Sequence, residues 1–279
     1  MATSSLVVEI SGDGGMGVWQ RLRYIATNVA RNMTRMGIRL CRRRFCSARL
    51  SRTPMTASPG RVLTESFLLT ELPHLLAQRE IRVLEIGCGS GSVTRLLAEG
   101  GYRGEYVGID ILDRFDHGDQ AEFRRQFVQT DAHGFEPEGQ FDLIISVSAL
   151  EHILDDHLLL KRFTAFLAPG GLQLHFVPSA WGLFANLWHG YRQYNLAALV
   201  NRFDVTRAKV YYMGGMATLL LHVVFITLGE ILLPLSLRKR IPRAYGGFLD
   251  YCLRLDRLFP RCGTMYAVIQ SELPNQQRE

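Results

Sequence analysis

The chain has 279 residues, of which 47% are hydrophobic and 21% are charged, and its formal net charge is +6 at pH 7. This length suits one large domain with a short extension, and the composition excludes a largely disordered or collagen-like chain. The five cysteines show no C-x-x-C spacing, which argues against a zinc site or a disulfide framework and favours a reducing compartment. The first fifteen residues are polar and contain acids, unlike a secretory signal, so we expect a cytoplasmic protein.

The positive charge is concentrated near the N-terminus. Residues 14–64 contain eleven arginines and no Asp or Glu. Apolar residues recur between these arginines at three- and four-residue steps, which predicts a cationic amphipathic helix. They are Trp19, Leu22, Ile25, Ala26, Val29, Met33, Met36 and Leu40. Such a helix suits an anionic membrane surface. A loosely ordered extension and an organellar transit peptide stay open, whereas the scarcity of aromatic residues argues against nucleic acid.

The stretch 51–60, SRTPMTASPG, has the composition of a linker. It divides the chain into an N-terminal extension (1–60) and a domain (61–279). A helix is predicted over 61–78, and strands and helices then alternate. Strands are predicted at 81–87, 105–110, 123–132, 141–150, 172–178, 203–212 and 264–272, and helices at 92–100 and 155–171. Continuously apolar strands that alternate with helices predict a mostly parallel sheet covered on both faces.

A glycine-rich turn follows the first of these strands. Gly87, Gly89 and Gly91 stand at every second position, and Glu85 precedes them. A dinucleotide-binding turn has the pattern G-x-G-x-x-G, but here Ser92 follows Gly91 directly. A carboxylate beside the turn disfavours a pyrophosphate and suits a ligand that carries an ammonium and a sulfonium group. S-adenosylmethionine is such a ligand.

At these residues the chain resembles the class I S-adenosylmethionine-dependent methyltransferases, in particular the group related to the ubiquinone and menaquinone pathway enzymes. The resemblance covers about residues 62–178 and rests on EIGCGSG, the acids Asp110 and Asp131, FDLIISVSALEHI and LAPGG. It implies that Asp110 binds the ribose hydroxyls and that Asp131 binds the adenine amino group. The cofactor-binding candidates are Glu85, Gly87, Cys88, Gly89, Gly91, Asp110, Ile111, Asp131, Ala132 and Ser146.

The same resemblance gives a catalytic candidate. Related O-methyltransferases carry E-x-x-E-H after the fourth strand and hold a divalent metal there, but this chain has Ser148 in place of the first acid. We therefore predict no metal site. His152 is a candidate general base, with a structural role in capping the next helix as the alternative. His175, His189, Tyr191 and Tyr194 lie where the family places its substrate lid.

A long apolar insert, about 214–260, separates the last two predicted strands. Its stretch 211–237 is long enough to span a bilayer, but both of its ends must return to one sheet, which argues against a single crossing. The alternatives are a lid facing lipid at a membrane surface, and a core or dimer contact.

The sequence therefore predicts a Rossmann-like α/β fold with seven strands, helices on both faces, an N-terminal basic helix and an apolar insert. The predicted function is methyl transfer from S-adenosylmethionine to an oxygen of a small hydrophobic, lipid-linked or glycan acceptor. Peripheral association with an anionic membrane is part of this hypothesis. The alternatives are an NAD(P)-dependent oxidoreductase and a non-catalytic scaffold that binds the cofactor.

Overall fold

The computed structural model describes residues 41–183, 190–204, 206–233, 235–258 and 263–271, together with five isolated positions between 19 and 30. The described residues form one eight-stranded sheet in the order β1-β7-β8-β6-β5-β2-β3-β4. The strands are β1 (Cys41–Phe45), β2 (Glu80–Ile86), β3 (Arg103–Asp110), β4 (Phe123–Gln129), β5 (Phe141–Val147), β6 (Leu167–Pro178), β7 (Ala208–Met213) and β8 (Met265–Ser271). All pairs are parallel except those that β8 makes with β6 and β7.

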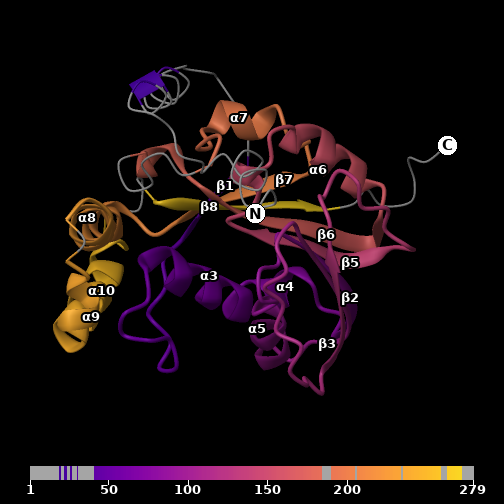
Figure 1. Cartoon of the computed structure of the whole chain (residues 1–279), viewed down its shortest axis with the longest axis horizontal. Coiled ribbons are helices and arrows are strands. Elements are labelled where there is room, and N and C mark those ends of the chain that lie inside the picture. Colours follow the sequence, from indigo (N-terminus) through magenta and orange to yellow (C-terminus); the bar gives the residue numbers. More distant parts are fainter. Residues whose placement is uncertain are drawn as a thin grey trace, which may run out of the picture.

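Helices cover both faces of this sheet, so the sheet is the middle of three layers (Figure 1). One face carries α3 (Pro59–Thr70), α4 (Leu72–Leu75) and α5 (Val93–Glu99), and the other carries α6 (Asp156–Thr164) and α7 (Leu196–Val200). Each face has its own apolar core, because the central strands are buried on both sides. The predicted mixed α/β fold with a mostly parallel, doubly covered sheet is therefore confirmed.

The sheet has one strand more than the seven that were predicted. Cys41–Phe45 forms the edge strand β1, parallel to β7, although the sequence placed these residues in the extension. The strand is anchored by Phe45, which is buried and packs edge-on against Phe67 at 5.0 Å between ring centroids. Its three arginines are exposed at the sheet edge, where charged side chains discourage pairing with another chain. The folded unit therefore begins before residue 60.

The predicted linker is also part of the folded unit. Thr53 and Ala57 are buried, and Ser58 caps α3 by accepting a hydrogen bond from the backbone N–H of Arg61. The Pro, Ser and Thr residues of this stretch serve tight turns and a helix start rather than a flexible connection.

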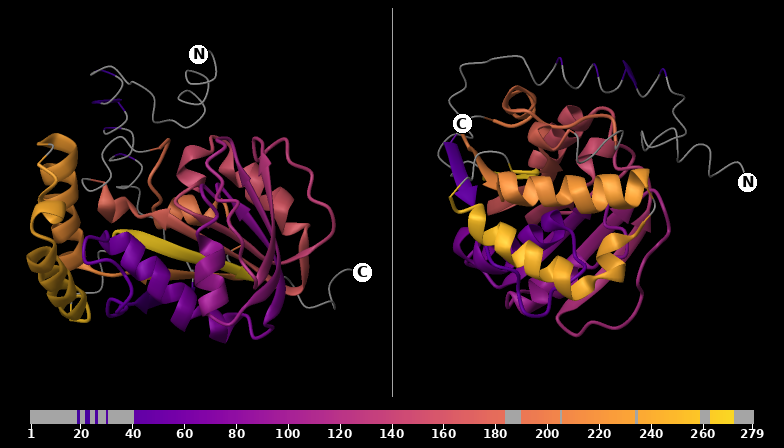
Figure 2. Two further views of the ribbon diagram at one scale, coloured as in Figure 1. Left: turned by 60° about the horizontal axis from the view of Figure 1, so that its bottom comes forward. Right: turned by 90° about the vertical axis from the view of Figure 1, so that its left-hand side faces the viewer.

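The apolar insert folds into a helical hairpin at one end of the sheet. It comprises α8 (Met216–His222), which continues as the π-helix η3 (Val223–Leu232), and then α9 (Leu237–Arg240) and α10 (Pro242–Leu255). The two long arms of the hairpin run side by side (Figure 2). In the part of the chain that the structure describes, no helix is both long enough and apolar enough to cross a membrane.

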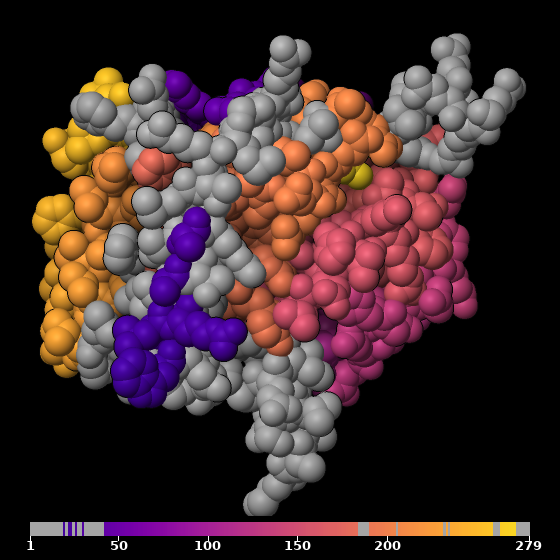
Figure 3. Space-filling model, turned by 90° about the horizontal axis from the view of Figure 1, so that it is seen from above, coloured from indigo at the N-terminus to yellow at the C-terminus, as the bar shows by residue number. Residues whose placement is uncertain are grey.

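Most of the predicted N-terminal helix lies outside the described residues. The five described positions of this segment are helical, and Trp19 and Leu22 are exposed among them. Seen from above, segments after residue 150 form most of the described surface, and the insert lies along one side (Figure 3).

Candidate active site

The glycine turn joins β2 to α5 and is tied to the neighbouring strand. The backbone N–H groups of Gly87 and Cys88 both donate to the carbonyl of Ile109, at 2.8 and 3.0 Å. Gly87, Gly89 and Gly91 all have positive φ angles, which side chains rarely tolerate. The backbone, and not the side chains, therefore fixes the shape of this turn.

The three glycines have different surroundings. A Cβ atom on Gly87 would lie 2.4 Å from the Cβ of Ala149, and one on Gly91 would lie 2.6 Å from the ring of Phe127. A Cβ on Gly89 would meet no atom within 4 Å. Gly87 and Gly91 therefore permit close packing, while Gly89 presents bare backbone to open space.

Glu85 is buried beside this open space. Its carboxylate accepts a hydrogen bond of 2.5 Å from the hydroxyl of Tyr106 on β3. Burial raises the pKa of Glu85 to about 8, and the charge of Asp110 adds to this effect, although the bond from Tyr106 opposes it. Glu85 is therefore mostly protonated at pH 7 without a ligand, and a cation placed against it would favour the ionised form.

Asp110 ends β3 and holds the turn from the opposite side. One carboxylate oxygen accepts from the N–H of Gly89 at 2.8 Å, and the other accepts from the N–H of Leu112 at 2.9 Å. Each carboxylate oxygen has a second lone pair, so these bonds leave acceptor capacity for a ligand. Asp110 thus anchors the turn, and it can also bind two vicinal hydroxyls.

Asp131 follows β4, the strand next to β3, so it lies at the same carboxyl edge of the sheet. Its side chain is exposed and accepts a hydrogen bond from the N–H of His133 at 2.8 Å, as a turn residue does. Ala132 is buried beside it, and Ile111 is half-buried after β3. The acids that follow β3 and β4 therefore extend from the glycine turn along one edge of the sheet.

A cavity of about 860 Å³ opens between the glycine turn and the N-terminal half of α3. This volume lies near the upper end of the usual range for ligand pockets, roughly 300–1,000 Å³. Glu85, Gly87, Cys88 and Gly89 line the cavity from β2 and its turn. Further walls come from α3, α5 and the ends of β5, β6 and β8, and they include Arg61, Thr64, Ser92, Arg95, Ser148, Glu151, Pro178, Thr264 and Met265.

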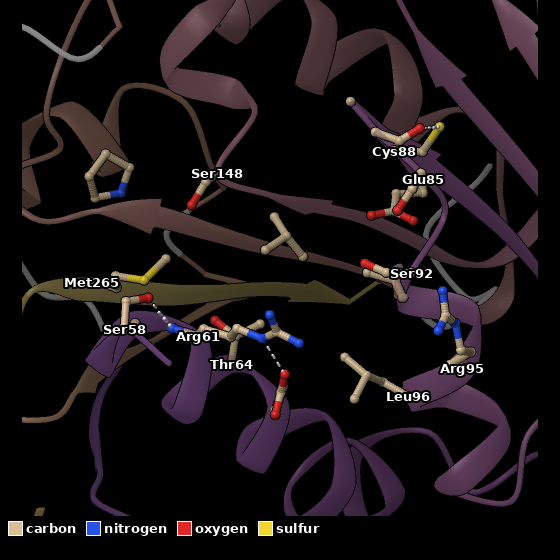
Figure 4. A pocket seen from close by; sticks show the side chains of 18 of the residues that line it. Ser58, Arg61, Thr64, Glu85, Cys88, Ser92, Arg95, Leu96, Ser148 and Met265 are labelled. Atoms are coloured by element: carbon tan, nitrogen blue, oxygen red, sulfur yellow. Dashed lines mark hydrogen bonds and ion pairs between the residues drawn. The ribbon is translucent and has the colours of Figure 1, made fainter. Parts of the chain in front are cut away.

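Figure 4 shows the arrangement along this cavity. Glu85, Cys88 and Ser92 lie toward one end, and Ser58 and Met265 lie toward the other, with Ser148 on the wall in between. Cys88 contributes a largely buried sulfur, and burial raises the pKa of its thiol above the ordinary value, so it is not a nucleophile at neutral pH.

Ser146 and His175 do not line this cavity. They face the other layer of the sheet, where the Ser146 hydroxyl contacts His175 Nδ1 at 2.8 Å and Gln173 Oε1 contacts His175 Nε2 at 2.9 Å. Burial lowers the pKa of His175 to about 3, so this ring is neutral and fully hydrogen-bonded. The structure therefore gives these two residues a structural setting.

His152 ends the short 3-10 helix η1 (Leu150–His152) and is half-buried, but it is not among the residues that line the cavity. Its neighbour Glu151 does line the cavity. The backbone N–H of His152 donates to the carbonyl of Ala149 at 3.0 Å. A catalytic role for His152 stays a prediction.

The predicted lid segment is partly fixed to the body of the protein. Tyr194 is buried and donates to Asp156 at 2.7 Å, and Arg202 also contacts Asp156 at 2.6 Å. The N–H of Tyr191 donates to the carbonyl of Glu151 at 2.7 Å, so this segment buttresses the residues after β5. His189 lies outside the described residues.

No cluster of three or more His, Cys, Asp or Glu side chains suited to a metal occurs within the described ranges.

Sequence reasoning missed two residues of the site. Tyr106 could have been found from the register of β2 and β3. Glu85 on β2 lies opposite Gly108 on β3. Tyr106 precedes Gly108 by two residues, so its side chain points to the same face of the sheet as Glu85. Gly108 leaves room for the Tyr106 hydroxyl, since a Cβ there would lie 2.9 Å from it. His222 lines the cavity from the insert. No motif marks His222, because only the fold brings the end of α8 to this cavity.

Comparisons with known proteins agree with this geometry. The profile of the methyltransferase domain family matches residues 43–209. The ubiquinone biosynthesis O-methyltransferase of Bradyrhizobium diazoefficiens is 30% identical over 99 residues, which cover 34% of this chain and 38% of that protein. The corresponding protein of Roseobacter denitrificans is 32% identical over 102 residues, covering 34% and 40%. The chain thus spans about two fifths of the length of these curated relatives.

Among solved structures, the plantazolicin methyltransferase BpumL in complex with SAH superposes with a TM-score of 0.52 at 14% identity, covering 97% of each chain. This likeness shows the shared fold. The chain belongs to the methyltransferase domain family, within the class I S-adenosylmethionine-dependent methyltransferases. The nicotinamide alternative has no support from these comparisons.

Proposed function

We propose that the protein transfers the methyl group of S-adenosylmethionine to an oxygen atom of a small, hydrophobic or lipid-linked acceptor. The observation that carries this proposal is the cavity that buried Glu85 and the bare backbone at Gly89 line together. A cavity of about 860 Å³ accommodates a cofactor and part of an acceptor together. The names of the curated relatives support oxygen as the accepting atom.

Each residue has a defined task in this proposal. Glu85 attracts the cationic methionine end of the cofactor, Asp110 accepts from the ribose hydroxyls, and Asp131 and Ala132 bind the adenine. The sulfonium group is already activated, so the main contribution of the protein is to hold the acceptor oxygen in line with the methyl–sulfur bond. A base takes the acceptor's proton, with His152 as the sequence-based candidate.

The acceptor class is inferred from the outer surface of the insert. Four apolar side chains at four-residue intervals are exposed along α8 and η3, namely Met216, Leu220, Val224 and Leu228. Phe248 and Tyr251 are exposed on the neighbouring helix α10. Contiguous exposed apolar surface of this kind usually marks an interaction site.

The charges of the insert favour an anionic partner for this surface. All three of its acids have partners within the protein: Glu230 pairs with Arg238, Asp250 pairs with Arg49, and buried Asp256 accepts from Thr218. The exposed basic side chains of the insert are Lys239, Arg240, Arg243, Arg254 and Arg257. Apolar side chains flanked by cations fit the surface of an anionic membrane, which is where a lipid-linked acceptor would be found.

The transfer is tested with S-adenosylmethionine that carries a labelled methyl group and with a lipid extract as the source of acceptor. We expect label in a lipid-soluble product whose new methyl group is bound to oxygen. The matched control is Asp110→Asn, compared with Asp113→Asn at an exposed carboxylate three residues further on. Label on nitrogen or carbon, or no transfer by the full chain, would contradict the proposal.

Membrane association is tested by flotation with vesicles of anionic and of zwitterionic lipid at low salt. We expect binding to the anionic vesicles only, and weaker binding after Leu220→Glu. Leu158→Glu on α6 is the control, because Leu158 is exposed to the same degree (56%, against 57% for Leu220) but lies on another helix. Equal effects of the two substitutions, or no binding of the full chain, would refute the proposal.

A further inference from the structure

Ser148 directly follows β5 and lines the cavity. Side chains of a strand alternate between its two faces, so a straight continuation of β5 would point Ser148 to the same layer as Ser146. The φ angle of Ser148 is instead +50°, which ends this alternation. The residue is exposed, and Figure 4 shows its hydroxyl directed into the cavity, between Glu85 and Met265. The backbone turn at Ser148 therefore brings a hydroxyl group to the cavity.

This backbone conformation is unusual for a residue that has a side chain. Positive φ angles are costly for residues other than glycine. Among the described residues, only Ser148 and Ser236 combine a side chain with a positive φ angle. Glycine would meet the backbone requirement with less strain, as it does at Gly87 and Gly89 in the neighbouring turn. A strained serine at a cavity wall therefore indicates a task for its side chain.

The backbone of Ser148 is fixed, whereas its hydroxyl is free. Its N–H group donates to the carbonyl of Phe176 on β6 at 2.9 Å. The next residue, Ala149, packs against the glycine turn, since a Cβ on Gly87 would lie 2.4 Å from the Cβ of Ala149. The Ser148 hydroxyl has no hydrogen-bond partner among the described residues. It is therefore held beside the glycine turn with its proton available to a ligand.

The order of the strands places Ser148 on the side from which an acceptor would approach. Asp110 ends β3 and Asp131 follows β4, so the proposed sites for ribose and adenine lie on one side of β2. On the other side of β2 the sheet continues with β5, β6 and β8. The transferred methyl group of S-adenosylmethionine lies between the ribose and the methionine part, and thus near β2. An acceptor would therefore reach this methyl group over the end of β5, where Ser148 stands.

We propose that Ser148 binds the acceptor: its hydroxyl donates a hydrogen bond to the acceptor oxygen and directs the other lone pair of that oxygen at the methyl group. This inference rests on the proposed function. The oxygen attacks the methyl carbon, the carbon–sulfur bond breaks, and its electron pair stays on sulfur, which becomes a neutral thioether. The proton of the acceptor hydroxyl passes to a base, and Ser148 keeps its own proton. Ser148 therefore contributes orientation, which accounts for much of the rate of such a transfer.

The test compares Ser148→Ala with Ser148→Gly, because both remove the hydroxyl but only glycine relieves the backbone strain. The initial rate of labelled methyl transfer is measured at a limiting amount of lipid extract. Both variants should lower this rate by about tenfold or more, because a hydrogen bond is lost and the acceptor oxygen is misplaced. Their calorimetric dissociation constants for S-adenosylhomocysteine should stay within about twofold of the wild type, because the hydroxyl contacts the acceptor and not the cofactor. Ser148→Gly should unfold at a higher temperature than Ser148→Ala.

Ser236 provides a matched control, because its φ angle is +46° and it lies in the insert, outside the residues that line the cavity. Ser236→Ala and Ser236→Gly should differ in unfolding temperature in the same direction as the Ser148 pair, with transfer and binding unchanged. A wild-type rate in either Ser148 variant would overturn the role of Ser148 while leaving the proposed function intact. A loss of S-adenosylhomocysteine binding as large as the loss of rate would do the same. If the wild type transfers no methyl group to oxygen in the extract, the proposed function fails and the role of Ser148 fails with it.

Discussion

Glu85→Gln gives a direct measurement of what the buried carboxylate does. Glu85 is almost fully buried, and its pKa is raised from 4.5 to about 8, mainly by burial. In the unfolded chain the same carboxylate ionises near its ordinary pKa. Between these two values the folded protein keeps a proton that the unfolded chain loses, so the free energy of unfolding falls as the pH rises.

The expected size of this effect follows from the pKa values. Buried neutral histidines also change stability near pH 6.5, because the unfolded chain still binds protons there, but they do so equally in the wild type and in Glu85→Gln. The difference between the two proteins from pH 6.5 to 8 therefore isolates Glu85. A shift of one pKa unit corresponds to 1.36 kcal/mol, so the wild type should lose between about 1 and 2 kcal/mol relative to Glu85→Gln across this window. Glu85→Gln carries no ionisable group and should not show this loss. Urea unfolding of both proteins at several pH values measures the difference.

Binding of the cofactor should also depend on the ionisation of Glu85. A cation against Glu85 favours the ionised carboxylate, so binding at pH 7 should release close to one proton from the wild type and none from Glu85→Gln. Calorimetry in two buffers of different ionisation enthalpy counts these protons. Glu85→Gln should also bind the cofactor at least about tenfold more weakly. Parallel pH slopes for the two proteins, together with equal proton release, would refute the electrostatic role of Glu85.

Three further substitutions test other parts of the site. Asp110→Asn should weaken S-adenosylmethionine binding by about tenfold or more, because hydrogen bonds to a charged acceptor contribute roughly 1.5–3 kcal/mol, whereas Asp113→Asn should leave calorimetric binding unchanged. Gly91→Ala should lower the free energy of unfolding by at least about 2 kcal/mol, because φ is +75° and the new Cβ would meet the ring of Phe127. Urea unfolding measures this change, and a decrease of less than about 0.5 kcal/mol would contradict the prediction. His175→Gln should cost about 1–3 kcal/mol at pH 7 by disturbing a buried hydrogen-bonded pair. Since its pKa is lowered to about 3, wild-type stability should also fall from pH 6.5 toward pH 3, and unchanged acid unfolding in the variant would show that His175 does not cause that fall.

The glycine turn and the acid that ends the next strand could be predicted from sequence because their backbone requirements are local. The positive φ angles of Gly87 and Gly89 need glycine at fixed positions after a strand, and Asp110 must end the next strand. Because these residues are required at fixed positions, they form a short sequence motif that can be recognised. Tyr106 left no such pattern, because its contact with Glu85 depends on the register of two strands.

Ser146 illustrates that a sequence motif can locate the end of a strand without showing to which face of the sheet each side chain points. Its neighbours in β5 alternate between the two layers, and a shift of one position moves a side chain from one face of a sheet to the other. Val147 and Ser148 line the cavity, whereas Ser146 points to His175. The motif located the strand end correctly, but it did not determine which side chains line the cavity.

The edge strand β1 was missed for a different reason. The apolar period of the N-terminal segment suggested helix up to Leu40, and the run Cys41–Phe45 contains three arginines, which do not predict a strand. The strand forms because β7 offers an unpaired edge and because Phe45 fills a gap beside Phe67. Tertiary contacts of this kind override local propensity.

The insert connects the outer surface of the protein to the cavity through the segment that precedes α3. Arg238 donates to the carbonyl of Thr56 at 2.8 Å, and Tyr245 donates to the carbonyl of Ala57 at 3.0 Å. The next residue, Ser58, lines the cavity, as does His222 on the insert itself. Direct hydrogen bonds therefore join the insert to the segment that leads into one wall of the cavity.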